Sequence, residues 1–234
     1  MIQAELIVVA AGKGSRMGTD LKKQYLPLGG RPILVRTLQA LAASAAVARI
    51  VIVASAEDLG FVQELVREHG VAKVGAVVPG GRERQDSVRY GLDALLPETT
   101  LVAVHDAARP LVTVEEVEAV LTAAQERGAA TLGVRVKDTI KRVVGGSVEE
   151  TLPREQLWAV HTPQAFHRDW LEEAHRKSVE GQNLLGTDDA SLVEWTGRPV
   201  QMVEGRYTNL KITTPDDLVV AEALWAQRQE IERS

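Results

Sequence analysis

Glycines and cationic side chains gather near the start of the chain, in the segment AAGKGSRMGTDLKKQYLPLGGRP at residues 10–32. Gly12 and Gly14 follow an apolar run, and Arg16 and Lys23 come shortly after them. The backbone N–H groups of a glycine loop, together with several cations, suit the phosphates of a nucleoside triphosphate. Because the whole chain carries a net charge of -5, we expect its cations to concentrate where such an anion binds.

Two better-known glycine motifs do not fit this segment. A dinucleotide-binding fingerprint needs glycine where the chain has Met17, and a Walker A loop needs a lysine and then Ser or Thr at a spacing that the chain lacks. For the glycines alone, a tight turn that lets the chain leave a sheet is the favoured interpretation. Of the adjacent Lys22 and Lys23, one can be a solvated surface residue, and we expect Lys23 to contact the ligand.

A second glycine segment, PGGRERQDSV, occupies residues 79–88. It places Gly81 at a predicted strand end and Ser87 on the first turn of the next predicted helix. Such a loop could read a base through its backbone N–H and C=O groups. A plain turn with a capping Asp86 or Ser87 explains the same residues equally well.

The segment HDAARP at residues 105–110 closes a further predicted strand with one carboxylate. Asp106 is well placed there to hold Mg²⁺, which takes one or two protein carboxylates together with phosphate oxygens and water. The alternative for Asp106 is a turn or helix cap. We expect His105 to be a packed strand-end side chain, and His167 and His175 to lie on a solvated helix without metal-ligand spacing.

Several reaction classes are disfavoured by what the sequence lacks. There is no cysteine, which removes thiolate nucleophiles, disulfides and thiolate zinc sites, and no G-x-S-x-G elbow for a serine nucleophile. Phosphate chemistry remains open, because a phosphate monoester is already ionised near neutral pH, with a second pKa of about 6. Such a nucleophile needs no general base.

Composition limits the partners and the compartment. The 234 residues are 45% hydrophobic and 25% charged with an acidic balance, which argues against a general nucleic-acid binder. The apolar run LIVVAA at residues 6–11 is too short for a signal sequence or for a membrane helix of about 20 residues. We therefore expect a cytoplasmic protein with no membrane partner.

The first half of the chain alternates short β-rich runs with helical segments. Strands are predicted at 5–10, 49–54, 73–78 and 101–105. Helices are predicted from Pro32 onward, at about 58–69 and 84–96, and after a capping box of Thr113 and Glu116. This alternation predicts an α/β fold with a mostly parallel sheet and helices on both faces.

The second half begins with a segment of different character at about 136–158. β-Branched residues on either side of Gly145 and Gly146 predict a hairpin, and its exposed edges favour a β-arm that pairs with a second copy in a homodimer. After this arm we expect a helix at about 167–178, another capped by Thr187, strands near 199–203 and 208–212, and a last helix started by Thr214 and Pro215. No linker is visible, so residues 1–234 are predicted to form one domain.

Eight ordered segments resemble a known family across nearly the whole chain. They are AAGKGSRM, KQYLPLGGRPIL, GGRERQDSV, HDAARP, DTIKR, LWAVHTPQAF, TDDASLVEW and NLKITTPDDL. In this order they are similar to the 2-C-methyl-D-erythritol 4-phosphate cytidylyltransferases. The resemblance implies a Rossmann-like nucleotidyltransferase fold and a dimer with interlocking β-arms. It also implies the reaction of CTP with methylerythritol phosphate to give diphosphocytidyl-methylerythritol and pyrophosphate. This reaction belongs to the non-mevalonate route to isoprenoids.

The resemblance also implies roles for individual residues. The nucleotide would contact Ala10, Ala11, Gly12, Gly14, Gly81, Ser87 and Ala107. The catalytic cations would be Arg16, Lys23 and Lys211, and Asp106 would hold Mg²⁺. The polyol phosphate would bind to Arg109, Thr139, Arg154, Thr162 and Thr187, some of them reaching across the dimer.

Three other functions are compatible with parts of this pattern. A ribitol 5-phosphate cytidylyltransferase has similar motifs, although the segments AAG at 10–12 and DAARP at 106–110 favour methylerythritol phosphate. A glycosyltransferase with a similar sheet would usually need an Asp-x-Asp motif in a suitable loop. A nucleotide-binding regulator without turnover would not need Lys23, Asp106 and Lys211 together.

Overall fold

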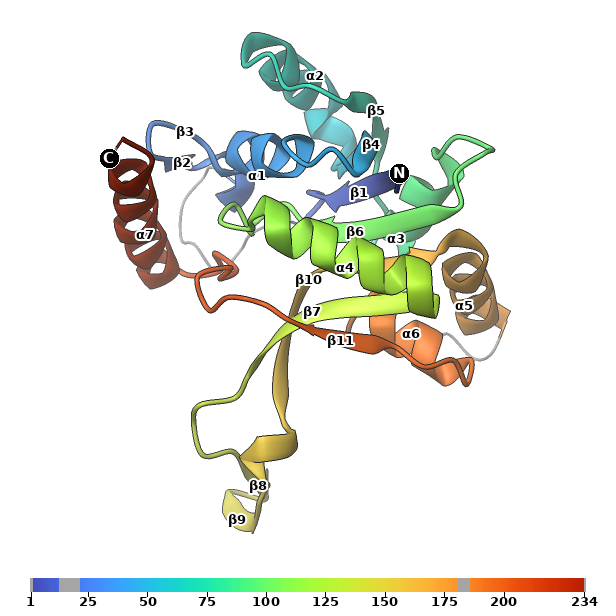
Figure 1. Ribbon diagram of the computed structural model, residues 1–234, viewed down its shortest axis with the longest axis vertical. Coiled ribbons are helices and arrows are strands. Elements are labelled where there is room, and N and C mark those ends of the chain that lie inside the picture. Colours follow the sequence, from blue (N-terminus) through green and yellow to red (C-terminus); the bar gives the residue numbers. More distant parts are fainter. Residues whose placement is uncertain (1, 13–21, 181–185, 234) are drawn as a thin grey trace.

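The fold is built on a seven-stranded sheet (Figure 1). The computed structural model describes residues 2–12, 22–180 and 186–233, so Gly14 and Arg16 lie outside the described residues. The strands are β1 (Ala4–Val9), β4 (Val47–Ala54), β5 (Val74–Pro79), β6 (Leu101–Asp106), β7 (Ala129–Arg135), β10 (Trp158–His167) and β11 (Gln201–Glu204). They are ordered β11-β7-β10-β6-β1-β4-β5.

The pairings in this sheet are parallel except at β10. β1 is parallel to β4 and β6, β4 to β5, and β7 to β11, whereas β10 is antiparallel to both β6 and β7. Along β1, successive side chains are buried on opposite faces, with Leu6, Ile7 and Val8 fully buried. This is typical of a parallel strand covered on both sides, and it confirms the predicted mostly parallel sheet.

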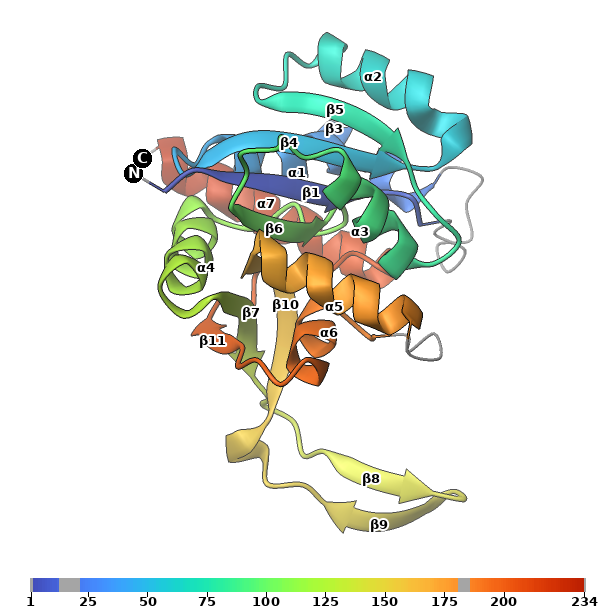
Figure 2. The ribbon, with the colours of Figure 1, turned by 90° about the vertical axis from the view of Figure 1, so that its right-hand side faces the viewer.

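Helices cover both faces, as the sequence predicts (Figures 1 and 2). One core cluster packs α1 (Ile33–Ala42), α2 (Leu59–Glu68) and α4 (Val114–Arg127) against one face. The other cluster packs α3 (Arg84–Asp93), α5 (Arg168–Glu180) and α6 (Asp189–Trp195) against the opposite face. The predicted capping box of Thr113 and Glu116 starts α4.

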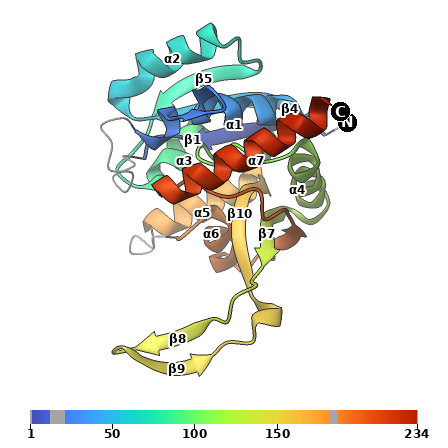
Figure 3. The same ribbon diagram turned by 90° about the vertical axis from the view of Figure 1, so that its left-hand side faces the viewer.

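The last helix, α7 (Pro215–Arg233), starts at Pro215 as predicted and lies on the α1 side of the molecule (Figure 3). Beside it lies a small sheet of β2 (Pro27–Leu28) and β3 (Arg31–Pro32). Leu28 and Ile33 share a buried cluster with Leu111, Ile212 and Ala221. The segment around β2, β3 and the start of α1 is thus packed against the C-terminal helix.

The predicted β-arm extends away from the sheet (Figure 2). Its hairpin consists of β8 (Lys141–Val144) and β9 (Ser147–Thr151), and Gly145 and Gly146 take positive φ angles of 57° and 83° in the turn. Two consecutive residues with positive φ are what a tight hairpin turn requires. Three apolar side chains of the hairpin are exposed to 54%, 61% and 61%, namely Val143, Val144 and Val148.

A close contact between α3 and β1 places the start of α3 beside the site. A Cβ atom added at Gly91 would lie 2.5 Å from Cγ2 of Ile7, so only glycine allows the helix to pack this near. Gly80, which follows β5, lies so near Ala11 that an added Cβ would be 2.5 Å from the Ala11 Cβ, so α3 begins next to the carboxyl ends of β1 and β5. This is the edge where a parallel sheet binds its ligands.

Four sequence predictions are wrong. Residues 208–212 form no strand. This segment lies beside the residues that follow β6, and the Ile212 N–H donates to the Ala108 carbonyl at 2.9 Å. The residue that caps α6 is Asp188 rather than Thr187, because its carboxylate accepts the Ser191 N–H at 2.9 Å.

The other two errors concern histidines. His175 is only 2% exposed, since it faces inward from α5, and His167 ends β10 rather than lying on a helix.

Candidate active site

The carboxyl ends of β1, β5 and β6 surround a cavity of about 300 Å³. Its lining combines the two glycine segments with cations from distant parts of the chain. The lining residues are Val9, Ala10, Ala11, Gly12, Lys23, Gln24, Gly81, Arg82, Glu83, Arg84, Ser87, Asp106, Ala107, Ala108 and Lys211. Every described residue that the sequence assigns to the nucleotide or to catalysis lies in this lining.

Lys23 lies on a short 3-10 helix, Lys23–Tyr25, that is anchored on both sides. Before it, the Lys22 ammonium group contacts Glu57 at 2.8 Å and Asp58 at 2.7 Å. Within the helix, directly after Lys23, the buried Gln24 side chain donates to the Ala10 carbonyl at 2.8 Å. Lys22 is therefore a structural residue, and Lys23 is the member of the pair that lines the cavity. Its contact with a ligand stays a prediction.

The second glycine loop is held by the Ser87 side chain. Its hydroxyl accepts the Gly81 N–H at 3.1 Å and donates to the Glu83 carbonyl at 3.1 Å. Ser87 is 2% exposed, so its main observed role is to fix the loop. Fixing the loop leaves its backbone groups to line the cavity.

Asp106 is surrounded by three cationic side chains. The Lys211 ammonium group lies 2.8 Å from Oδ2, and the Nε atoms of Arg84 and Arg109 lie 3.5 and 3.6 Å from Oδ1 and Oδ2. Burial acts to raise the pKa of Asp106, but Lys211, Arg84 and Arg109 outweigh it and hold this pKa well below its usual range. Asp106 is therefore ionised at neutral pH.

A second cavity of about 290 Å³ adjoins the first. It is lined by Arg84, Asp106, Arg109, Val160, His161, Thr162, Gln164, Thr187, Asp188 and Lys211. Three predicted polyol-phosphate contacts, Arg109, Thr162 and Thr187, are in this lining. The two cavities share Arg84, Asp106 and Lys211 as a common wall.

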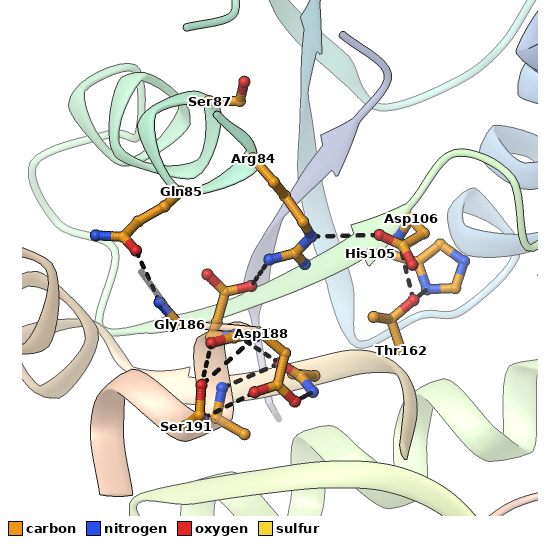
Figure 4. A network of polar contacts seen from close by, with 12 residues as sticks. Arg84, Gln85, Ser87, His105, Asp106, Thr162, Gly186, Asp188 and Ser191 are labelled. Carbon is orange, nitrogen blue, oxygen red and sulfur yellow. Dashed lines mark hydrogen bonds and ion pairs between the residues drawn. The ribbon is translucent and has the colours of Figure 1, made fainter. Parts of the chain in front are cut away.

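The Thr162 hydroxyl group orients the end of β6. It accepts the Asp106 N–H at 3.0 Å and lies 3.1 Å from His105 Nδ1 (Figure 4). The other ring nitrogen of His105 lies 3.2 Å from the Arg109 carbonyl, which can only accept a proton, so Nε2 carries the hydrogen and Nδ1 accepts from Thr162. Burial lowers the pKa of His105 to about 4. His105 is a packed strand-end side chain, as predicted.

Two predicted polyol-phosphate residues lie outside this cavity. Thr139 and Arg154 are exposed residues of the arm, and the Arg154 Nη1 group donates to the Lys137 carbonyl at 3.1 Å. One chain therefore does not bring them to the other site residues. Gly14 and Arg16 lie outside the described residues, so the structure does not place them.

Among the residues that line the cavities, the sequence did not point to Arg84, Gln164 or Asp188. Arg84 lines both cavities, and Gln164 and Asp188 line the second. Gln164 lies on β10, where a register shift between Val160 and Gln164 interrupts the pairing with β7. Such bulges often occur beside active sites. Arg84 belongs to the segment PGGRERQDSV, in which only the glycines and Ser87 have a pattern that points to a ligand.

A divalent metal fits this site only if phosphates supply most of its ligands. Asp106 is the one carboxylate that lines both cavities, and the described residues contain no group of three metal-binding side chains. Mg²⁺ is commonly held by one or two carboxylates plus phosphate oxygens and water. The residues present are therefore compatible with a metal that arrives with a nucleotide.

The fold and the site together define an α/β protein whose cavities at the carboxyl edge of the sheet suit phosphate-bearing ligands. The sequence profile of the 2-C-methyl-D-erythritol 4-phosphate cytidylyltransferases matches residues 4–227. The chain therefore belongs to the 2-C-methyl-D-erythritol 4-phosphate cytidylyltransferase family.

Individual relatives agree with this assignment. The protein of this name from Pelotomaculum thermopropionicum is 52% identical, over 98% of this chain and 97% of its own length. That of Halalkalibacterium halodurans is 46% identical, over 97% and 99%. The solved 4-diphosphocytidyl-2C-methyl-D-erythritol synthase of Anaerococcus prevotii superposes with a TM-score of 0.84 at 28% identity, over 96% of this chain and 99% of that one.

Proposed function

We propose that this chain transfers the cytidylyl group of CTP to 2-C-methyl-D-erythritol 4-phosphate and releases pyrophosphate. The observation that carries the proposal is the wall shared by the two cavities, where Arg84, Asp106 and Lys211 stand between a glycine-rich cavity and a threonine- and arginine-lined one. Two phosphate-bearing substrates placed in the two cavities would meet at this wall. Family membership supplies the identities of the substrates.

The nucleotide would occupy the cavity lined by the glycine segments. Gly12 and Gly81 offer backbone groups, and Ala107 follows β6 where a ribose could lie. Lys23 and Lys211 come from opposite ends of the chain and face the same cavity, which suits a triphosphate. Arg16 is proposed to assist them on the strength of the family resemblance.

The methylerythritol phosphate would occupy the second cavity. Arg109 and Thr187 line it, and Thr162 lines it while its hydroxyl proton is directed to His105. Thr162 is therefore better suited to hold Asp106 and His105 in place than to donate to a phosphate. The guanidinium of Arg109 is a donor that matches phosphate oxygens.

The reaction we propose is an in-line attack by a phosphate oxygen of the polyol phosphate on the α-phosphorus of CTP. That oxygen is already ionised near neutral pH, so no side chain has to remove a proton. The new P–O bond forms as the bond to the leaving pyrophosphate breaks, and Lys23 and Lys211 stabilise the charge that grows on the phosphoryl oxygens. The two glycine segments would orient the nucleotide for this attack.

We further propose that Mg²⁺ accompanies the nucleotide and that Asp106 contributes one ligand. When bound, the ion would neutralise phosphate charge. The part of the chain that the structure describes supplies no cluster of acids that could hold it without phosphates. Pyrophosphate release should accordingly be lost with a chelator and restored by added Mg²⁺, and metal-independent turnover would remove Asp106 from this role.

We also propose that the active unit is a homodimer joined through the arms. The exposed valines of β8 and β9 need a cover, and Thr139 and Arg154 on the arm could reach the second cavity of a partner.

No helix in the described part of the chain has the length and apolar composition to span a bilayer. The cytoplasmic location stays a prediction.

The decisive experiment offers the protein CTP and Mg²⁺ with one polyol phosphate at a time and measures pyrophosphate. Release with methylerythritol phosphate and none with ribitol 5-phosphate is the expected result. Release with ribitol 5-phosphate alone would overturn the substrate assignment. Binding of CTP without release would indicate a regulator instead.

A further inference from the structure

Asp189 is a buried carboxylate that the proposed mechanism does not use. It is the first residue of α6 and is fully buried, although Asp188, the capping residue, lines the second cavity. The Arg84 Nη1 group donates to its Oδ2 at 2.7 Å, and Nε2 of the buried His175 lies 3.3 Å from its Oδ1. Burying a carboxylate costs free energy that its ion pairs only partly offset. We therefore ask what a charged group at this position contributes to the site.

The backbone at Asp189 is held as firmly as its side chain. The Gln164 Oε1 atom accepts the N–H groups of both Asp189 and Ala190 at 3.1 Å. The Gln164 amide nitrogen donates to Asp188 Oδ2 at 2.7 Å. The start of α6 is therefore tied to β10, and Asp189 provides a fixed negative charge behind the wall of the second cavity.

Arg84 connects this fixed charge to Asp106. It is the first residue of α3 and extends toward Asp106, with its Nε 3.5 Å from Oδ1 (Figure 4). The pKa of Asp189 is held below its ordinary value mainly by Arg84, against the effect of burial, so the carboxylate stays charged and keeps its hold on the guanidinium. One side chain thus contacts both a buried anchor and a carboxylate shared by the two cavities.

We propose that Asp189 and Arg84 form a positioning pair, in which Asp189 fixes the Arg84 guanidinium so that Arg84 holds Asp106 in the wall shared by the two cavities. The inference rests on the function proposed above. Asp106 in turn contacts Lys211 at 2.8 Å, so the pair sets the placement of a catalytic cation as well. Arginine is needed because its planar fork can contact two carboxylates at once, whereas a lysine ammonium group is a single point charge.

The test is a double-mutant cycle of Asp189→Asn and Arg84→Gln, with kcat, both KM values and the melting temperature measured for each protein. We expect Asp189→Asn to lower kcat about tenfold and Arg84→Gln to lower it thirtyfold to a hundredfold, in the range that a displacement of about 1 Å costs. The KM for CTP should change less than about threefold, because the pair fixes groups at the reacting centre rather than the glycine loops.

The double variant separates positioning from folding. Arg84→Gln alone leaves a buried carboxylate without its arginine and should melt at a lower temperature, while the double variant removes that charge and should regain part of the loss. If the pair only stabilises the fold, kcat will recover along with the melting temperature. If the pair positions Asp106, we expect the kcat of the double variant to stay within about twofold of the kcat of Arg84→Gln. Recovery of kcat, or a normal kcat in Asp189→Asn, would overturn the inference.

A matched control is available at the opposite edge of the sheet. Arg49 pairs with the buried Glu5 at 2.6 Å, near the amino ends of β1 and β4. Arg49→Gln should lower the melting temperature and leave kcat unchanged, and a comparable fall in kcat would show that destabilisation alone explains the other variants. An inactive wild-type protein would instead contradict the proposed function, so the two failures are distinguishable.

Discussion

Asp106 shows how one residue of this site depends on its neighbours. The carboxylate ends a buried strand and is held by Lys211, Arg84 and Arg109 on three sides. Its position at a strand end was predictable because parallel strands end at one edge of the sheet. The surrounding arginines were less predictable, since Arg84, at the start of α3, lies more than twenty residues before Asp106 in the chain.

The first prediction concerns Lys23. Lys23→Ala should reduce turnover by about two orders of magnitude or more, because the residue lines the cavity proposed for the nucleotide and would stabilise charge on the transferred group. Steady-state kinetics with CTP and methylerythritol phosphate test this, with circular dichroism to verify folding. Lys177→Ala is a suitable control, since Lys177 lies on α5 and pairs with Glu173 away from both cavities. Near-normal turnover in Lys23→Ala would exclude Lys23 from catalysis.

The second prediction concerns the effect of pH on stability through His105. Its pKa is about 4 in the folded protein and about 6.5 when unfolded, so the unfolded state takes up a proton first as the pH falls. The free energy of unfolding should therefore decrease between about pH 6.5 and 4, by roughly 2–3 kcal/mol for this group, and the full contribution should be present above pH 6.5.

Urea unfolding at pH 7, 5.5 and 4.5 measures this dependence, and His105→Gln should weaken it. His161 shares part of the effect, because burial and Arg109 lower its pKa to about 4 as well. Asp106, whose pKa is lowered, adds a loss of stability only at more acidic pH. An unchanged pH dependence in His105→Gln would contradict the assignment to this residue.

At the scale of elements, strand patterns predicted β1, β4, β5, β6 and β11 and missed β7 and β10. β1, β4, β5 and β6 are continuous apolar runs, which the sequence shows directly. β10 includes His161, Thr162, Pro163 and Gln164, polar or strand-breaking residues that the site requires, so its pattern is not that of a core strand. The polar residues that line the second cavity therefore hide the strand pattern of β10 in the sequence.

The reverse error occurred at residues 208–212. Apolar and polar residues alternate in this segment as they do in a strand. Its backbone, however, forms hydrogen bonds with side chains and with single backbone groups rather than with a neighbouring strand. The Asn209 carbonyl accepts from Arg109 at 2.8 Å, and Ile212 is buried beside α7. A local pattern cannot distinguish this extended path from a paired strand, because the difference lies in which distant segment is adjacent.

The third prediction concerns the capping box of α4. The Thr113 hydroxyl accepts the Glu116 N–H at 3.3 Å, and Thr113→Ala should lower the free energy of unfolding by about 1 kcal/mol. Turnover should stay normal, because Thr113 lines neither site cavity. Thermal or urea unfolding together with kinetics tests both parts. A loss of turnover without a loss of stability would contradict this purely structural role.

At the scale of the whole molecule, the arm distinguishes this fold from a plain sheet with two helical layers. It extends from β7 and returns into β10 (Figure 2). Its valines Val143, Val144 and Val148 are exposed in a single chain. The turn glycines and the β-branched residues predicted the hairpin, because that signal is local. Its direction relative to the sheet was not predictable, because no sequence pattern encodes where a hairpin points.

The fourth prediction follows from the proposed homodimer. Replacing Val143 and Val148 by glutamate should convert the dimer to a monomer, because two charges would be introduced into an apolar contact. The KM for methylerythritol phosphate should rise at least tenfold while CTP binding changes little, since only the second cavity is proposed to receive Arg154 from a partner. Light scattering and calorimetric titration with CTP measure the two effects, and a dimer that survives with unchanged kinetics would contradict the arm contact.

The one reversed strand of the sheet has a mechanical consequence. β10 begins at the base of the arm with Trp158 and carries Thr162 and Gln164 into the wall of the second cavity before it ends beside α5. In the proposed dimer, a displacement at the base of the arm would be transmitted along β10 to the second cavity. Subunit contact and polyol-phosphate binding, both proposed above, would then be linked through one strand.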